Sequence, residues 1–157
     1  MSDSDLAEIL GRIPSGLFIL TVRFRNEETG MLASWVMQAG FEPPMLTVAV
    51  QRPRNVADWL TACAPFVINV IADSDKALMK HFGRGFEPGQ SAFTGLDIGR
   101  TSHDVPILPG TVGHLECTPT AHLDSGDHRV FMANIVAGRR VSDFAPYLHV
   151  RKNGLRY

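Results

Sequence analysis

Residues 30–50 of this chain are GMLASWVMQAGFEPPMLTVAV. The apolar run from Gly30 to Met37 is too short to span a membrane, and its Val, Trp and Ser residues favour a strand over a helix. Residues 45–50 alternate between two sets of side chains, as a strand with two different faces does. We therefore expect two buried strands, joined by a turn that Pro43 and Pro44 hold.

Small side chains on these strands would let a flat ligand approach the backbone. Ala33, Ser34, Ala39 and Gly40 leave N–H and C=O groups open to the edge of such a ligand. Two interpretations follow. The strands belong to the core of an ordinary β-protein, or they form a surface for a planar cofactor with many hydrogen-bond acceptors.

The other expected elements come from apolar periodicity and turn residues. A short amphipathic helix should follow a capping box formed by Asp5 and Glu8, and Pro53 should lie in the first turn of a second helix. Asp73 is expected to cap a third helix that ends near Phe82. The other expected strands are residues 17–22, 66–71, 112–123, 128–141 and 147–150, with an edge position or a bulge at Pro119.

A long segment without clear periodicity lies between the third helix and the last hairpin. Residues 83–110 are rich in Gly and Pro, which predicts an irregular connection. Such a loop is either a lid over a cofactor or a packed surface loop. Its glycines do not form a dinucleotide fingerprint, because Pro88 takes the third glycine position and the segment follows a helix.

Length and composition bound the class of protein. A chain of 157 residues with 45% hydrophobic content fits one domain spanning residues 1–157. The net charge of −1 argues against a nucleic-acid or anionic-membrane partner. Cys63 and Cys117 lack paired spacing and the first residues lack a basic leader, so we expect a cytoplasmic protein.

The common catalytic motifs are missing from the sequence. It contains no HExxH or paired-cysteine zinc spacing, no Gly-x-Ser-x-Gly elbow and no Walker loop. His114, Glu116 and His122 would share one face of an ideal strand, but Pro119 interrupts that strand. We therefore expect no protein-bound metal.

Several further segments form a pattern with residues 30–50. They are GRIPSG at 11–16, FVINV at 66–70, LEC at 115–117, GDH at 126–128 and HVRKNGLRY at 149–157. Together they resemble the flavin reductase-like, FMN-binding split-barrel family, and within it the reductase domain at the C-terminal end of some flavodiiron proteins. The resemblance implies a mainly β fold, a six-stranded antiparallel Greek-key split barrel with a few short helices, and a homodimer.

The same resemblance implies an NAD(P)H:FMN oxidoreductase, with FAD as the alternative flavin. Hydride would pass from the nicotinamide C4 to flavin N5, and electrons would continue to free flavin, oxygen or a partner protein. A second hypothesis is an FMN-binding electron-transfer module without its own NAD(P)H activity. A third is a split-barrel haem protein with a histidine ligand. The residues do not choose NADH over NADPH.

Site residues are carried over from the family position by position. His128 takes the role in NAD(P)H binding or hydride transfer. Arg52 and Arg54, beside a helix start, suit the flavin phosphate. The expected flavin contacts are Ala33, Ser34, Trp35, Val36, Gln51, Arg52, Arg54, Asn55, His81 and Phe82. The expected residues on the nicotinamide or nucleotide side are Gly126, Asp127, His149, Arg151 and Tyr157.

One stretch departs from the family pattern. Many stand-alone reductases carry hydroxyl residues after the Gly-Met pair, whereas this chain has Leu32 and Ala33, with Trp35 after Ser34. The flavin edge would lose side-chain hydroxyls and gain an indole contact. The pattern is similar to the flavodiiron-attached subset, and the electron acceptor stays open among free flavin, oxygen and a separate partner protein.

Overall fold

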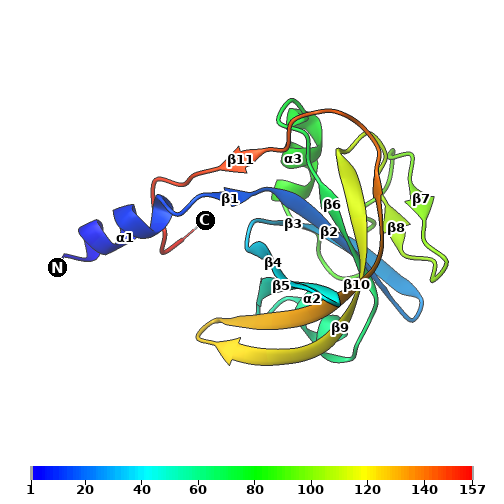
Figure 1. Cartoon of the computed structure of the whole chain (residues 1–157), viewed down its shortest axis with the longest axis horizontal. Coiled ribbons are helices and arrows are strands. Elements are labelled where there is room, and N and C mark those ends of the chain that lie inside the picture. The colour runs from blue at the N-terminus through cyan, green and yellow to red at the C-terminus, as the bar shows by residue number, and fades with distance from the viewer. Residues whose placement is uncertain (1, 157) are drawn as a thin grey trace.

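The computed structural model describes residues 2–156, and most of them belong to one antiparallel sheet that curves into a barrel (Figure 1). Within these residues the main sheet has seven strands in the order β3-β2-β6-β9-β10-β5-β4. The mainly β, antiparallel split-barrel class is thus confirmed. The strands are β2 (Phe18–Phe24), β3 (Glu27–Ala33), β4 (Val36–Phe41), β5 (Pro44–Gln51), β6 (Phe66–Val70), β9 (Gly113–Ser125) and β10 (His128–Arg140).

Two hydrophobic clusters use the two faces of the sheet. Leu20, Val48 and Phe131 belong to the cluster inside the barrel. Ile19, the neighbour of Leu20 on β2, belongs to a second cluster that includes Phe82 of a helix. Because successive side chains on a strand point to opposite faces, the continuous apolar run on β2 feeds both clusters.

The sheet has one strand more than expected because residues 30–37 do not form a single strand. β3 ends at Ala33, and β4 begins at Val36. β3 and β4 are the two edge strands of the sheet, so Ser34 and Trp35 carry the chain from one edge to the other. β4 is also largely exposed, which corrects the expectation of a buried first strand.

The three helices of the described chain begin at residues other than those expected. In α1 (Asp3–Gly11), the cap is Ser2, whose side chain accepts from the Asp5 N–H, so the capping box is wrong. α2 (Asn55–Thr61) has Arg54 at its N-cap, and Pro53 lies before the helix. α3 (Lys76–Gly83) is capped by Asp75 in place of Asp73.

The last hairpin follows the prediction closely. β9 and β10 flank a turn at Gly126 and Asp127, and Gly126 has a φ of 59° that suits glycine. The β9–β10 register shifts beside Pro119, so the predicted bulge is confirmed. Beyond that point β9 pairs with β10 alone, because its pairing with β6 ends at Cys117.

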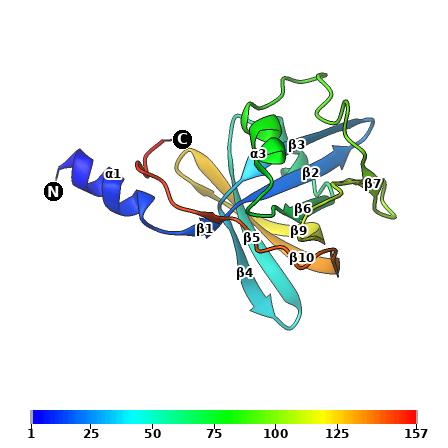
Figure 2. The ribbon, with the colours of Figure 1, turned by 90° about the horizontal axis from the view of Figure 1, so that it is seen from above.

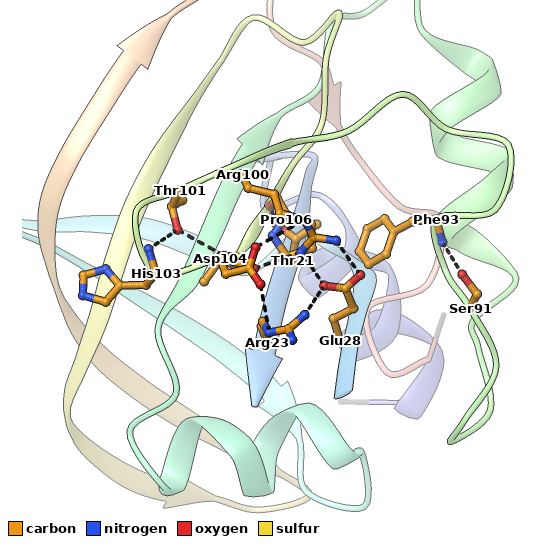
Figure 3. Close-up of polar contacts among 11 residues, drawn as sticks. Thr21, Arg23, Glu28, Ser91, Phe93, Arg100, Thr101, His103, Asp104 and Pro106 are labelled. Carbon is orange, nitrogen blue, oxygen red and sulfur yellow. Dashed lines mark hydrogen bonds and ion pairs between the residues drawn. The ribbon is translucent and has the colours of Figure 1, made fainter. Parts of the chain in front are cut away.

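The irregular segment 83–110 is fastened to the barrel at its far end. It holds a small sheet of β7 (Gly99–Arg100) and β8 (Pro106–Ile107). Figure 3 shows Arg100 and Arg23 pointing toward Glu28 of β3. Arg100 Nη1 lies 2.7 Å from the Glu28 carboxylate and Arg23 Nη1 lies 3.1 Å from it, while Asp104 pairs with both arginines.

The two ends of the chain form an arm beside the barrel (Figures 1 and 2). β1 (Ser15–Gly16) pairs with β11 (Leu148–His149) in a separate two-stranded sheet. The expected closing strand 147–150 is therefore shorter than predicted and does not join the barrel. The Arg151 N–H donates to Gly11 O, which ties the C-terminal segment to the end of α1.

Candidate functional site

The split of the barrel is the gap in the sheet ladder between its two edge strands, β3 and β4, which do not pair with each other. β3 pairs only with β2, so its other edge lies outside the sheet ladder. β4 pairs with β5 only as far as Val48, and beyond it the Ala49 N–H donates to Trp35 O at 3.1 Å. The outer edge of β3 therefore presents backbone groups that no strand of the described sheet pairs, as hydrogen bonding to the edge of a flat ligand requires.

Beside this split, Trp35 contacts the hairpin that carries His128. The centroids of the indole and imidazole rings are 4.6 Å apart, with the ring planes at 43°. The His128 Nδ1–H donates to Asp127 Oδ1 at 2.7 Å. His128 is only 6% exposed, whereas Trp35 is 37% exposed. The indole thus covers an imidazole that a carboxylate orients.

Arg151 reaches the same cluster from the arm. Its guanidinium carbon lies 5.3 Å from the centroid of the Trp35 ring, within the range of a cation–π contact. The structure therefore brings together four of the predicted site residues, namely Trp35, Asp127, His128 and Arg151. They come from three separate parts of the chain.

The turn of the hairpin is tied to the end of β5. Gln51 is the cross-strand partner of His128. The Arg52 N–H donates to Asp127 O at 3.0 Å, and Arg52 Nη1 donates to Gly126 O at 3.3 Å. Gln51 and Arg52, both predicted as flavin contacts, thus lie beside His128, and Arg52 supports the turn.

Neighbouring groups shift the pKa values of two residues in or near the cluster, Asp127 and His149. The hydrogen bond from His128 lowers the pKa of Asp127, so this exposed carboxyl stays ionised at neutral pH. Burial, and then the charge of Arg151, lower the pKa of His149. An oriented imidazole beside a carboxylate can hold or move a proton, or bind an amide group.

Arg54 and Asn55 lie away from this cluster, at a cavity of about 520 Å³. The cavity lies between the start of α2, the β2–β3 turn and residues 86–91. Glu28, Trp59 and Phe86 line it but were not predicted. Nothing in their local sequence marks them, because three distant segments meet here.

Ser34 and His149 line a second cavity, of about 400 Å³. Lys76, Lys80 and Tyr147 line it as well and were not predicted. The spacing of the lysines was an available signal, because residues four apart lie on one face of a helix.

The remaining predicted residues have structural contacts. His81 Nε2 lies 2.7 Å from Ala92 O, which ties α3 to the 83–110 segment. Phe82 is buried against Gly30, and Ala33 is buried at the end of β3. Val36 is partly buried at the start of β4. Tyr157 lies outside the described residues.

Two negative findings concern residues 2–156. They include no group of three or more His, Cys, Asp or Glu side chains placed to hold a metal ion. None of their helices has the length and apolar character needed to cross a membrane.

Comparison with known proteins gives a consistent set of matches. The sequence model of the flavin reductase like domain matches residues 10–155. A relative from Synechocystis, diflavin flavoprotein A 1, is 36% identical over 157 residues, which is 99% of this chain and 27% of that protein. A putative diflavin flavoprotein A 1 from Thermosynechococcus vestitus is also 36% identical, over 99% of this chain and 28% of its own.

Solved structures share the fold at lower identity. The Streptomyces globisporus NADH:FAD oxidoreductase SgcE6 has a TM-score of 0.81 and 24% identity, covering 91% of this chain and 80% of its own. BorF, the flavin reductase component of a bacterial two-component tryptophan halogenase, has a TM-score of 0.83 and 18% identity, covering 95% and 94%. The chain spans about a quarter of the length of the two diflavin relatives.

Proposed function

The chain belongs to the flavin reductase like domain family, and from that membership we propose that it is an NAD(P)H:flavin oxidoreductase. FMN is the proposed flavin, and the hydride passes from nicotinamide C4 to flavin N5. Electrons then pass to free flavin, oxygen or a partner protein. The observation that carries the proposal is the carboxylate-oriented His128 under Trp35 at the split of the barrel.

The residues at the split fit a flavin. Its planar ring needs an aromatic neighbour and backbone groups at its edge, which Trp35 and the outer edge of β3 supply. Its phosphate needs cations, and Lys76 and Lys80 line the cavity that Ser34 also lines, while Arg54 lines the cavity away from the His128 cluster. When bound, flavin supplies the redox chemistry, which explains why the protein needs no nucleophile.

The protein's own part is positioning. Asp127 holds the His128 ring through Nδ1, so the imidazole presents a fixed orientation to a nicotinamide carboxamide. The hydrogen bonds from Arg52 to the turn keep Asp127 in place. Trp35 covers His128 and limits the access of water to it until the nicotinamide ring takes the place of the indole.

A second candidate function is the FMN-binding electron-transfer module. His128 is buried beneath Trp35, so a nicotinamide cannot reach it unless the indole moves. The match to about a quarter of each diflavin relative also suits a module that exchanges electrons with another protein part. In this alternative, FMN is bound tightly and NAD(P)H does not reduce it.

The proposed assembly is a homodimer. Large apolar side chains are exposed on β4, among them Met37 and Phe41. Others are exposed on the arm, among them Ile9, Ile13 and Leu148. Apolar surfaces of this kind are commonly covered by a partner, and a two-fold dimer would use the same patch on both subunits.

The test is a visible spectrum of the purified protein titrated with FMN and FAD, followed by anaerobic NADH and then NADPH. We expect FMN to bind and one nucleotide to bleach it, which also names the donor. Bound flavin that stays oxidised would support the electron-transfer module. A strong Soret band would instead indicate haem, and a protein that binds no flavin would refute both flavin functions.

Substitution of His128 tests its role directly. His128→Ala should retain flavin and slow its reduction by NAD(P)H by about 10²-fold, the scale expected when a reacting group loses its positioning contact. The exposed His103 serves as the matched control, and His103→Ala should leave the rate unchanged. Equal rates for the two variants would remove His128 from the reaction.

A further inference from the structure

The cavity of about 400 Å³ has an apolar floor and a cationic rim. Its lining residues come from the chain just before β2, the end of β3, α3 and the segment around β11, and Figure 1 shows β11 running from the side of α3 toward α1. Its volume falls within the usual range for small-molecule sites. Leu17, Leu32, Ala33 and Met79 form the floor, and Ser34, Lys76, Lys80, Tyr147 and His149 contribute the polar groups.

The positive charge of the cavity comes from two lysines on one element, α3. Lys76 and Lys80 are four residues apart on α3, and both line the cavity. Like charges at this spacing destabilise a helix, so the pair carries a cost that a bound anion would remove. None of the described residues that line the cavity is acidic. In a chain with a net charge of −1, this local excess is notable.

Residues that line the cavity are close neighbours in sequence of residues in the cluster around His128. Ser34 lines the cavity, and the ring of the next residue, Trp35, contacts the ring of His128. On the arm, His149 lines the cavity and Arg151 lies over Trp35. A ligand whose ring lies at Trp35 could therefore extend a charged end into the cavity.

We propose that this cavity binds the phosphate of a nucleotide ligand, with Lys76 and Lys80 as its cationic partners. The Ser34 hydroxyl adds a hydrogen-bond donor, and ammonium groups bind phosphate as compact point charges. Tyr147 orders the rim, because Lys76 Nζ lies 4.7 Å from the centroid of its ring. The inference rests on the proposed function for the identity of the nucleotide.

Two nucleotides could supply the phosphate, the flavin mononucleotide or the nicotinamide dinucleotide. The variant Lys76→Gln/Lys80→Gln removes both charges and keeps residues that favour helices. The matched control Arg12→Gln/Arg139→Gln removes two charges from exposed positions outside the cavity. The measurements are Kd values for FMN and riboflavin from flavin fluorescence, and KM values for NADH and NADPH.

If the flavin phosphate is bound here, the native protein should prefer FMN over riboflavin by about tenfold or more, as charge-assisted contacts allow. The lysine variant should lose that preference, and the control should keep it. If the dinucleotide phosphate is bound here, the lysine variant should instead raise KM for NADH or NADPH by about tenfold at an unchanged FMN preference. Either result supports the site.

A separate measurement does not depend on flavin chemistry. Inorganic pyrophosphate should raise the Tm of the native protein and of the control, and it should not raise that of the lysine variant. Unchanged Kd, KM and Tm responses in the lysine variant would overturn the site while leaving a flavin-reducing activity intact. A protein that binds pyrophosphate through these lysines but binds no flavin would keep the site and refute the proposed function.

Discussion

At the scale of single residues, Asn69 of β6 fastens the 83–110 segment to the barrel. Its Nδ2 donates to Ile19 O at 3.0 Å and to Thr21 Oγ1 at 3.1 Å, and its Oδ1 accepts from the Leu108 N–H at 2.9 Å. Thr21 in turn donates to Pro106 O at 2.6 Å. Asn69 is 0% exposed, so water cannot replace these partners.

Asn69→Ala should therefore lower the free energy of unfolding by about 2–3 kcal/mol, because buried backbone groups lose their partners. Urea denaturation of the two proteins measures the difference. Asn26→Ala, at an exposed position of the β2–β3 turn, should stay within about 0.5 kcal/mol of the native protein. A loss below about 1 kcal/mol for Asn69→Ala would mean that the loop does not depend on this side chain.

Residue-level prediction from sequence worked where the chemistry is local. Asp127 and His128 were identified from the adjacent residues of the Gly-Asp-His turn, and the structure shows a hydrogen bond between them. The contact of Trp35 with His128 joins distant segments, and no local pattern encodes it. Gly30 shows the same limit: a Cβ there would lie 2.6 Å from Phe82 Cε1, so the glycine is needed for packing against α3.

At the scale of elements, the ion network around Glu28 holds β7 and β8 against β2 and β3 (Figure 3). The hydrogen bond and charge of Arg100, with a further contribution from Arg23, lower the pKa of Glu28. A carboxyl with a lowered pKa in the folded state stabilises the protein above its unfolded pKa of about 4.3, and this contribution is lost as the pH falls through the folded value.

Glu28→Gln should cost about 1 kcal/mol at pH 7, since several charges form one network on a partly exposed surface. The difference from the native protein should shrink as the pH falls below the unfolded pKa, because the unfolded carboxyl is protonated first and the native carboxyl only at lower pH. Urea denaturation between pH 3 and pH 7 measures it. Glu27→Gln, its exposed neighbour, is the control. A difference that does not vary with pH would assign the effect to packing.

Elements were predictable where periodicity and turn residues agree, as in the β9–β10 hairpin. They were not predictable where an apolar run continues across a break. Residues 30–37 look like one strand, but the chain leaves one sheet edge at Ala33 and joins the other at Val36. Which edge a strand occupies depends on the closed sheet, and local propensity does not carry that information. Asp73 and Asp75 are equally good caps in isolation.

At the scale of the whole molecule, apolar side chains are exposed on two extensions of the barrel. Figure 2 shows the β4–β5 hairpin and the α1 arm reaching away from it in different directions. Phe41, at the end of β4, is 88% exposed, and Met37 on the same strand is 65% exposed. Monomeric proteins rarely expose large contiguous apolar surface, so both extensions suit contact with a second copy.

Phe41→Glu tests this assembly, because in a two-fold dimer each substitution places an unpaired charge in the interface on both subunits. We expect a dimer for the native protein, and for the variant a dimer dissociation constant raised by about 10²-fold, the usual effect of losing a buried aromatic anchor. Sedimentation velocity over a concentration series measures both.

Ser102→Glu adds the same charge in the exposed turn between β7 and β8, at the end of the molecule opposite α1 (Figure 1). This control should leave the dimer intact. Equal dissociation constants for the two variants would place the interface away from β4. A native protein that stays monomeric at every concentration would refute the dimer, and β4 would then be available to a different partner, such as the protein that accepts the electrons.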